Sequence, residues 1–338
     1  MIDVAIIGGG VCGAAIAYTL SKYALRICVL EKENDISMGT TKANSGIVHA
    51  GYDPEPGTRM ARLNRQGAEL VREIAGKLSV PYRQNGSLVL SFGPEDDAHL
   101  HRLYERGLQN GVQGLRLLGR DEVRGMEPNV NPAVTGALYA PGAAVVSPWG
   151  LCIAMAEVAA WNGCEFLLDY EVAAIRKEPD RFVLSARDGR VVEAKFVVNA
   201  AGLYADKICG MVCDCPFEIL PSKGQYYLLD KSEAGLVTHT LFQCPTERGK
   251  GVLVAPTAGG NLIVGPNAES NNERDDVSTT ASGLAEVIRE ARRTTDRINL
   301  KENVRSFAGL RAVSTEPDFI IAPAPGVPRF VNVAGIKS

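Results

Sequence analysis

The first 31 residues constrain the fold more than any other part of the chain. An apolar run over residues 2–7 is followed by the pattern Gly8-x-Gly10-x-x-Gly13, an Ala-rich segment and a second apolar run that ends at Glu31. This order predicts a buried strand, a tight turn, a helix and a parallel strand. A glycine pattern alone is weak evidence, but its place between a strand and a helix predicts a dinucleotide-binding unit.

Each of these residues has a physical role in such a unit. Gly8 permits the tight turn, Gly10 lets the backbone approach a pyrophosphate, and Gly13 lets helix and strand pack closely. The N-terminus of the helix offers N–H groups and a positive dipole end to the phosphates. Glu31 can accept hydrogen bonds from both ribose hydroxyls, and its charge would repel a 2′-phosphate, which argues against NADP.

The apolar stretch over residues 2–20 does not fit a targeting or membrane segment. Its first charged residue is Asp3, whereas a secretion signal begins with Lys or Arg, and three adjacent glycines lie near its middle. We therefore expect a cytoplasmic location, in which the eight cysteines stay reduced. Lys and Arg total 36 and Asp and Glu 39, so the net charge of −3 gives no indication of nucleic-acid binding.

Beyond Glu31 the chain departs from the pattern of nicotinamide dehydrogenases. A polar loop over residues 39–46 replaces the expected strand–helix repeat, and at 338 residues the chain is long enough for two domains. Besides the helix at 11–20, we predict helices over 57–78, 95–110, 148–162, 202–211 and 279–297. The helix over 57–78 is expected to place Met60, Leu63, Leu70, Ile74 and Leu78 near one face. Strands are predicted over 87–92, 165–168, 172–176, 182–186 and 191–199, with antiparallel strands of a second sheet over 224–229, 252–255 and 262–264.

Four motifs carry a resemblance to a known family. They are the loop 40–52 (TTKANSGIVHAGY), the turn 197–202 (VVNAAG), and the segments 306–311 (SFAGLR) and 332–337 (NVAGIK). In this order they resemble the D-amino-acid-oxidase-like family of FAD-dependent oxidoreductases. The similarity is greatest to the branch of flavin-linked glycerol-3-phosphate dehydrogenases and L-2-hydroxyglutarate dehydrogenases.

The resemblance implies an α/β fold with two interleaved domains. A Rossmann-like FAD-binding domain of the glutathione-reductase type would comprise residues 1–80, 145–215 and 305–338. An α+β substrate domain with a mostly antiparallel sheet would comprise 81–144 and 216–304. Family members continue beyond this point into a helix that faces the flavin, so we expect residues 1–338 alone to bind FAD loosely and to turn over poorly.

The resemblance also assigns residues to the cofactor. The expected FAD contacts are Gly8, Gly10, Gly13, Glu31, Thr40, Thr41, Ser45, Gly46, Val172, Ala201, Gly202 and Gly335. Val172 would contribute backbone contacts near the adenine, while the threonines and Ser45 would reach the pyrophosphate or the flavin.

Three residues are expected to act on a small anionic substrate. Arg311 matches the family's substrate arginine, and its planar fork can bind a carboxylate or phosphate through two hydrogen bonds. Lys337 matches a lysine of the glycerol-3-phosphate dehydrogenases. His49 has the ordinary pKa, about 6.5, of a proton acceptor at neutral pH, but it could equally serve to orient the backbone or the flavin.

Other candidates carry less weight. His99 and His101 are expected on a surface helix; His239 is expected in a loop, where it could face the substrate. Only one of Tyr226 and Tyr227 can point at the flavin, because they are successive strand residues. The spacing Cys209-x-x-x-Cys213-x-Cys215 matches no common zinc or iron–sulfur site, so no metal is expected.

The sequence therefore predicts an FAD-dependent dehydrogenase that oxidises glycerol 3-phosphate, or alternatively L-2-hydroxyglutarate. An amino-acid oxidase of the same family and a non-catalytic FAD-binding subunit stay open as alternatives. The electron acceptor (a quinone, a partner subunit or oxygen) is undetermined. A basic patch on the helix predicted at 279–297 is expected to be a solvated face, with peripheral membrane contact as the alternative.

Overall fold

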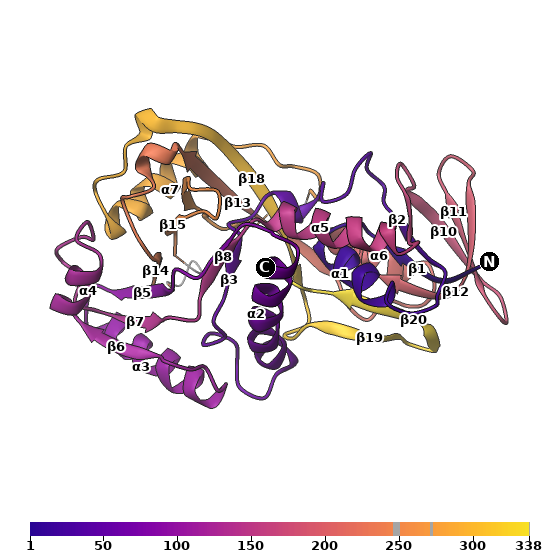
Figure 1. Ribbon diagram of the computed structural model, residues 1–338, viewed down its shortest axis with the longest axis horizontal. Coiled ribbons are helices and arrows are strands. Elements are labelled where there is room, and N and C mark those ends of the chain that lie inside the picture. The colour runs from indigo at the N-terminus through magenta and orange to yellow at the C-terminus, as the bar shows by residue number, and fades with distance from the viewer. Residues whose placement is uncertain (246–250, 271–272, 338) are drawn as a thin grey trace.

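Two large sheets organise the protein, and the chain passes between them repeatedly (Figure 1). The computed structural model describes residues 1–245, 251–270 and 273–337. Ser338, which follows the motif 332–337, lies outside the described residues. The N-terminal segment, residues 165–199 and the C-terminal segment contribute to the first sheet, while residues 87–140 and 219–314 build the second.

In the described residues, the first sheet has eight strands in the order β10-β11-β12-β1-β2-β9, with β20 beside β12 and β19 beside β20. Strands β9, β2, β1, β12 and β20 are parallel to their neighbours in that group, whereas β10, β11 and β19 pair antiparallel. Their bounds are β1 (Ile2–Ile7), β2 (Ile27–Leu30), β9 (Glu165–Leu167), β10 (Val172–Lys177), β11 (Phe182–Ala186), β12 (Val191–Asn199), β19 (Ile320–Ala324) and β20 (Val327–Ala334).

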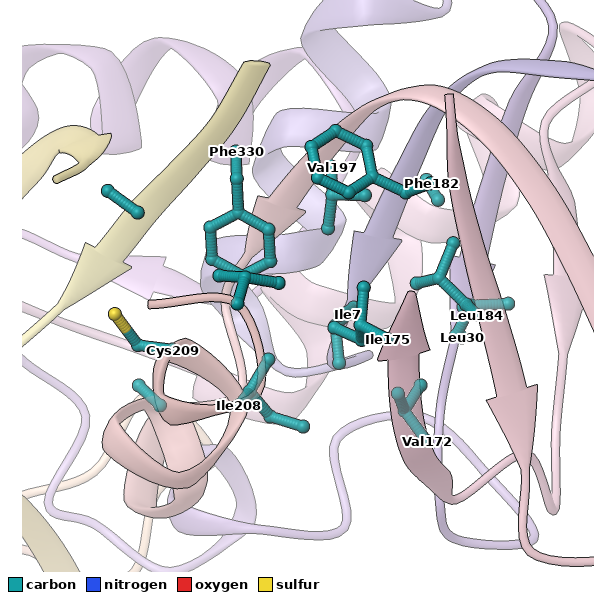
Figure 2. Close-up of a cluster of buried hydrophobic side chains, with 14 of the residues drawn as sticks. Ile7, Leu30, Val172, Ile175, Phe182, Leu184, Val197, Ile208, Cys209 and Phe330 are labelled. Atoms are coloured by element: carbon teal, nitrogen blue, oxygen red, sulfur yellow. The ribbon is translucent and has the colours of Figure 1, made fainter. Parts of the chain in front are cut away.

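Both faces of this sheet are covered, which explains the continuous apolar runs of its central strands. Ile6 faces α1 (Val11–Leu20) and α5 (Pro148–Trp161), and it packs in one core with Ala17 and Ala159. Ile7 faces the opposite way, into a larger core beside α6 (Ala205–Gly210) (Figure 2). The period of two along a strand therefore divides β1 between two cores.

The second sheet has nine strands within the described ranges, in the order β17-β13-β16-β15-β14-β5-β7-β6, with β18 paired to β13. All its pairings are antiparallel except that of β14 with β5. The bounds are β5 (Ser87–Ser91), β6 (Arg116–Gly119), β7 (Gly136–Ala140), β13 (Ile219–Leu229), β14 (Thr240–Gln243), β15 (Leu253–Pro256), β16 (Leu262–Gly265), β17 (Glu269–Ser270) and β18 (Asn303–Ser314).

Helices cover parts of both faces of the second sheet. Helices α7 (Ala281–Thr294) and α4 (Arg120–Met126) share a core with one face, through Val287 and Val123. Helix α3 (Pro94–Gln109) packs on the opposite face near β5 and β7. The rest of that opposite face presents Tyr226, Leu253 and Ile263, and it adjoins the candidate site.

A small third sheet and α2 lie near the centre of the molecule (Figure 1). The sheet consists of β3 (Ile47–Val48), β8 (Ala144–Val146) and β4 (Tyr82–Arg83). Short 3₁₀ helices occur elsewhere in the chain: η1 (Thr40–Lys42), η2 (Gly202–Tyr204), η3 (Lys231–Glu233) and η4 (Leu300–Glu302). Helix α2 spans Arg59–Lys77. Ile74 packs inward as expected, together with Ala61 and Ala75, whereas Leu70, also expected on this face, is exposed.

The predicted fold class is confirmed: a parallel-centred α/β sheet is interleaved with a mostly antiparallel second sheet. The predicted domain limits stay a prediction. Residues 305–314, which we assigned to the FAD-binding domain, lie in β18 and pair with β13 of the second sheet.

Glu127, directly after α4, has a buried carboxylate that joins the end of this helix to the segment before β14. It is 1% exposed and accepts backbone hydrogen bonds from Thr238 (2.9 Å) and His239 (2.7 Å). The Nδ1 atom of His239 lies 2.7 Å from the same carboxylate. A buried charge is tolerated when donors surround it, so Glu127 fixes the chain just before β14.

We expect Glu127→Gln to lower the free energy of unfolding by about 1–3 kcal/mol, because an amide cannot accept all of these hydrogen bonds. Urea unfolding followed by circular dichroism would measure the loss. The matched control is Glu122→Gln on α4, whose side chain is exposed and pairs with Arg116 at the surface. Equal effects of the two substitutions would contradict the role given to Glu127.

Candidate functional site

The glycine turn after β1 is held by very close backbone approaches. Gly8 has a φ of +107°, and a Cβ atom there would lie 2.5 Å from the carbonyl oxygen of Ala200. A Cβ at Gly13 would lie 1.9 Å from the carbonyl oxygen of Gly8. Any side chain at either position would displace backbone, so these glycines bring together β1, α1 and the end of β12.

The N-terminus of α1 meets this turn and suits an anion. The helix begins at Val11, has no acidic residue in its first turn, and its cap residue Gly10 offers no side chain. The N–H group of Val11 donates to Oγ1 of Thr41 at 3.0 Å, so the polar loop lies against the helix N-terminus. N–H groups and a positive dipole end at one point are the features that bind a pyrophosphate.

Glu31 lies at the end of β2 beside the same turn. Its carboxylate is 8% exposed and accepts hydrogen bonds from the N–H groups of Gly9 (2.6 Å) and Glu33 (2.9 Å). A carboxylate has about four acceptor positions, so two are left for the hydroxyls of a ribose. The glycine turn, the helix N-terminus and Glu31 together fit the adenosine and pyrophosphate of FAD.

The predicted flavin loop is anchored to β18 of the second sheet. Oγ1 of Thr40 donates to the carbonyl oxygen of Leu310 at 2.7 Å, and a Cβ at Gly309 would lie 1.9 Å from the carbonyl oxygen of Ala43. Asn44 holds the loop from inside by donating to the carbonyl oxygens of residues 40 and 41. The loop is therefore fixed to β18 on one side and to the N-terminus of α1 on the other.

The second half of this loop is equally constrained. Gly46 has a φ of +65°, and a Cβ there would lie 2.4 Å from the carbonyl oxygen of Val146 in β8. Ser45 is part-exposed next to it, and Ile47 and Val48 form β3 directly afterwards. The close approach at Gly46 positions His49, three residues further along the chain.

The segment around Arg274, between β17 and α7, contacts the turn that follows β12. The Arg274 guanidinium forms two hydrogen bonds with the carboxylate of Asp206 in α6, at 2.5 and 2.7 Å, and also donates to the carbonyl oxygens of Leu203 and Ile219. Both charged side chains are largely buried. Asp275 accepts a hydrogen bond from the hydroxyl of Tyr204. This contact holds the turn that contains Ala201 and Gly202.

His49 and Lys337 line the same cavity although they are far apart in sequence. The cavity is also lined by Met60, Asn64 and Phe319. The imidazole ring of His49 stacks on Phe242 of β14, with ring centroids 5.8 Å apart. The structure thus brings together two of the three predicted catalytic residues.

Arg311 lies on β18, on the sheet face that carries Tyr226. The guanidinium lies 3.5 Å from Oγ of Ser222 and 3.5 Å from the carbonyl oxygen of Asn267. A Cβ at Gly224 would lie 2.9 Å from a guanidinium nitrogen, so this glycine makes room for the arginine. Burial raises the pKa of Tyr226, and Arg311 beside it acts in the opposite direction.

The two tyrosines of β13 differ as the strand period requires. Tyr226 is buried and stacks on Phe307 with ring centroids 4.7 Å apart, whereas Tyr227 is packed on the other side against the core beneath α7. Tyr226 is therefore the tyrosine that shares a face with Arg311. Phe242 and Phe307 were not predicted as site residues, because nothing in the sequence distinguishes them from ordinary strand residues.

The remaining predicted residues lie elsewhere. His99 and His101 are on α3, and His239 precedes β14 with its ring held by Glu127. Val172 is buried at the start of β10, and Gly335 follows β20 with a φ of +68°. Their relation to a cofactor stays a prediction.

Sequence reasoning missed several polar residues around the cofactor turn. Asn199 and Asn332 are hydrogen-bonded to each other at 2.8 Å. Asp206 in α6 forms an ion pair with Arg274, which lies between β17 and α7. The partners are separated by 133 and 68 residues, so no local pattern could join them. The charged run at 273–276, between a predicted strand and a predicted helix, was the one signal available.

Among the described residues, no group of three or more His, Cys, Asp or Glu side chains is arranged to hold a metal ion. Within the same ranges, no helix combines the length and the apolar character that a membrane crossing needs.

We expect Glu31→Gln to weaken retention of FAD, because the amide adds an N–H group where ribose hydroxyls and the Gly9 N–H need acceptors. Flavin absorbance per protein after gel filtration would measure it. Glu33→Gln is the matched control, since its exposed carboxylate pairs only with Lys32 among the contacts described. Unchanged flavin content in the Glu31 variant would show that the adenosine lies elsewhere.

Arg274→Met should destabilise the protein in a pH-dependent way. Burial favours the neutral form of Asp206, but the hydrogen bonds from Arg274 and Ile219 hold the pKa of this carboxyl below its ordinary value. Because the folded pKa lies below the unfolded value of about 3.9, the stabilisation is present above that pH and is lost as pH falls through the folded pKa. We expect a loss of about 3 kcal/mol at neutral pH.

Urea unfolding of both proteins between about pH 7 and pH 3 would test this, and the difference between them should narrow on acidification. Arg187→Met is the control, because its pair with Glu171 is exposed and contributes little. A difference that stays constant with pH would exclude the ion pair as its source.

Comparisons with known proteins agree with this geometry. Residues 3–338 match the model of the family described as FAD dependent oxidoreductase. A glycerol 3-phosphate dehydrogenase of Caloramator mitchellensis is 46% identical over all of this chain, which covers 70% of that protein. An L-2-hydroxyglutarate dehydrogenase of Bos taurus is 34% identical over 79% of this chain, covering 60% of the relative.

A solved structure extends the comparison to the cofactor. The dithionite-reduced L-alpha-glycerophosphate oxidase of Mycoplasma pneumoniae, with FAD bound, superposes with a TM-score of 0.94 at 30% identity. The match covers 100% of this chain and 90% of the oxidase. This chain therefore belongs to the family of FAD-dependent oxidoreductases, and its cofactor is FAD.

Proposed function

We propose that this chain oxidises glycerol 3-phosphate at its secondary hydroxyl to dihydroxyacetone phosphate. The observation that carries the proposal is the meeting of His49 and Lys337 in one cavity, with Arg311 on the adjoining sheet face. The glycerol 3-phosphate dehydrogenase and the glycerophosphate oxidase, similar over the whole chain, support this substrate ahead of L-2-hydroxyglutarate.

Oxidation of a secondary alcohol removes a hydride from carbon and a proton from oxygen. When bound, FAD supplies the acceptor for the hydride. The protein has to hold the anionic end of the substrate, orient the reacting carbon and take the hydroxyl proton.

Arg311 is proposed to bind the phosphate. Its hydrogen bonds to Ser222 and Asn267 are long, 3.5 Å each, and it also contacts Tyr226, so its N–H donors can form better hydrogen bonds with an anion. Tyr226 beside it stays neutral because burial raises its pKa, and its hydroxyl is available as a donor on the same face. A planar guanidinium binds two phosphate oxygens at once, which fixes the orientation of the substrate.

Lys337 is proposed as the second cation for the same anion. It is part-buried and lines the cavity with His49, so a phosphate carrying close to two negative charges would be neutralised from two sides. A lysine acts as a point charge and does not require a planar partner, which complements the arginine.

His49 is proposed to take the hydroxyl proton. Stacking on Phe242 fixes the plane of its ring, and the close approach at Gly46 fixes the backbone that carries it. A histidine is suited to this role near neutral pH. The alternative is that His49 only orients its neighbours; a substitution would then change the KM more than the pH profile of kcat.

Anaerobic reduction of the flavin tests the function directly. Purified holoprotein would be mixed with glycerol 3-phosphate, L-2-hydroxyglutarate or glycine in the absence of oxygen. We expect glycerol 3-phosphate to bleach the flavin band fastest. Faster bleaching by either of the others would replace the proposed substrate, and no bleaching by any would favour a non-catalytic FAD-binding subunit.

A second arm of the experiment addresses the electron acceptor. Air would be admitted to the reduced protein, and hydrogen peroxide would be measured alongside the return of the flavin band. Stoichiometric peroxide would identify oxygen as an acceptor, whereas reoxidation only after a quinone is added would identify a dehydrogenase.

Arg311→Leu should lower kcat/KM for glycerol 3-phosphate, because a two-point contact with a charged group is lost. The lost transition-state stabilisation should amount to about 3 kcal/mol or more. Arg305→Leu on the same strand is the control, since that side chain is exposed at the far end of β18. Steady-state kinetics with equal flavin content would measure both. A change of less than about tenfold in the Arg311 variant would rule out the anchoring role.

A further inference from the structure

We propose that Cys209 and Cys213 form a disulfide when the protein meets a peroxide, and that closing it loosens the FAD-binding turn. Neither thiol takes part in the chemistry proposed above. Cys209 lies in α6, which follows the turn that contains Ala201 and Gly202, and Cys213 lies three residues after the last residue of this helix, Gly210.

The two sulfur atoms are already in contact. The Sγ atoms of Cys209 and Cys213 are 3.7 Å apart, and the N–H group of Cys213 donates to the carbonyl oxygen of Cys209, as in one turn of helix. Residues four apart on a helix have Cβ atoms about 5–6 Å apart, whereas a disulfide needs about 4 Å. Bond formation therefore requires this last turn to tighten by about 1–2 Å.

The exposures of the two thiols give them different roles. Cys213 is part-exposed, so a peroxide can reach its sulfur, whereas Cys209 is fully buried. Burial raises the pKa of Cys209, and the neighbouring thiols of Cys215 and Cys213 raise it further, so Cys209 is protonated at neutral pH. Cys213 is therefore the residue that reacts first, and Cys209 is the residue that resolves it.

The chemistry balances with one molecule of peroxide. The Cys213 sulfur attacks hydrogen peroxide, the O–O bond breaks, and a sulfenic acid and one water are formed. The Cys209 sulfur then attacks the sulfenic sulfur, the S–S bond forms, the S–O bond breaks, and a second water leaves with the thiol proton. Two thiols have then lost two electrons, which reduce the peroxide.

A buried chain of hydrogen bonds connects Cys209 with the cofactor turn. The Cys209 sulfur accepts a hydrogen bond from the Asn332 side-chain amide at 3.4 Å. The carbonyl oxygen of that amide accepts from Asn199 at 2.8 Å. Asn199 in turn accepts from the backbone N–H of Ala201 at 3.3 Å and donates to the carbonyl oxygen of Ala205 at 2.7 Å.

These hydrogen bonds transmit the effect of oxidation to the cofactor. Asn199 and Asn332 are fully buried, so a polar group that loses its partner there has no water to replace it. Drawing the Cys209 sulfur toward Cys213 removes the acceptor of the Asn332 amide, and Figure 2 shows Cys209 on α6 beside the Phe330-bearing strand that also carries Asn332. The asparagine pair must rearrange, and with it the support of the Ala201 N–H.

Peptide mapping tests the disulfide. Holoprotein would be treated with hydrogen peroxide, denatured, alkylated with iodoacetamide and digested with trypsin. The peptide 208–223 contains Cys209, Cys213 and Cys215. We expect it to lack two hydrogen atoms and to carry one alkyl group, on Cys215, and to take up three alkyl groups after reduction. Three alkyl groups without reduction, or an alkyl group on either of the other cysteines, would overturn the pairing.

Release of FAD tests the coupling. We expect peroxide-treated protein to lose FAD about fivefold faster or more on dilution, followed by flavin fluorescence, and reduction with dithiothreitol to restore retention. Cys213→Ser should abolish the effect of peroxide, whereas the matched Cys215→Ser should keep it. A disulfide that leaves the release rate unchanged, or equal peroxide sensitivity in the Cys213 variant, would overturn the coupling.

Discussion

The close contact between Gly8 and Ala200 is the constraint on which the rest of the site depends. A backbone approach that leaves no room for a Cβ holds the carboxyl end of β1 against the end of β12. Gly13 repeats this contact between α1 and the turn itself. The helix N-terminus, Glu31 and the residues after Asn199 therefore surround one point, which is where crevices for dinucleotides form in α/β sheets.

Much of this first unit could be predicted because its signals are local. The helix predicted at 11–20 is observed as Val11–Leu20, and Glu31 lies at the end of the strand as expected. The polar residues that support the turn could not be predicted in the same way. Asp206 and Arg274 are of residue types that usually lie at the surface. They form a buried pair only because the segment between β17 and α7 packs against α6. For Leu70 the sequence pattern was misleading. The helical period of α2 places it near the apolar face, but the packing leaves the side chain exposed.

Strand β18 shows why the two halves of the site were only partly predicted. The motif 306–311 was recognised in the sequence, but its place in the second sheet was not predicted. That place results from pairing with β13 over eleven residue pairs, which joins segments far apart in sequence. In this strand Gly309 presses on the cofactor loop, the carbonyl group of Leu310 holds Thr40, and Arg311 faces the proposed substrate. Three consecutive residues thus couple the position of the cofactor loop to that of the substrate anchor.

The pairing order of the first sheet has a consequence for how the chain folds during synthesis. Strand β1 can pair early with β2, but its other neighbour, β12, ends at Asn199, and β12 in turn waits for β20. At a translation rate of about 5–20 residues per second, the free edge of β1 stays unpaired for on the order of ten seconds. An apolar parallel strand with an open edge is prone to association with other chains. The nascent protein is therefore a natural client for chaperones that hold unfinished chains, and FAD can stabilise it only late in its synthesis.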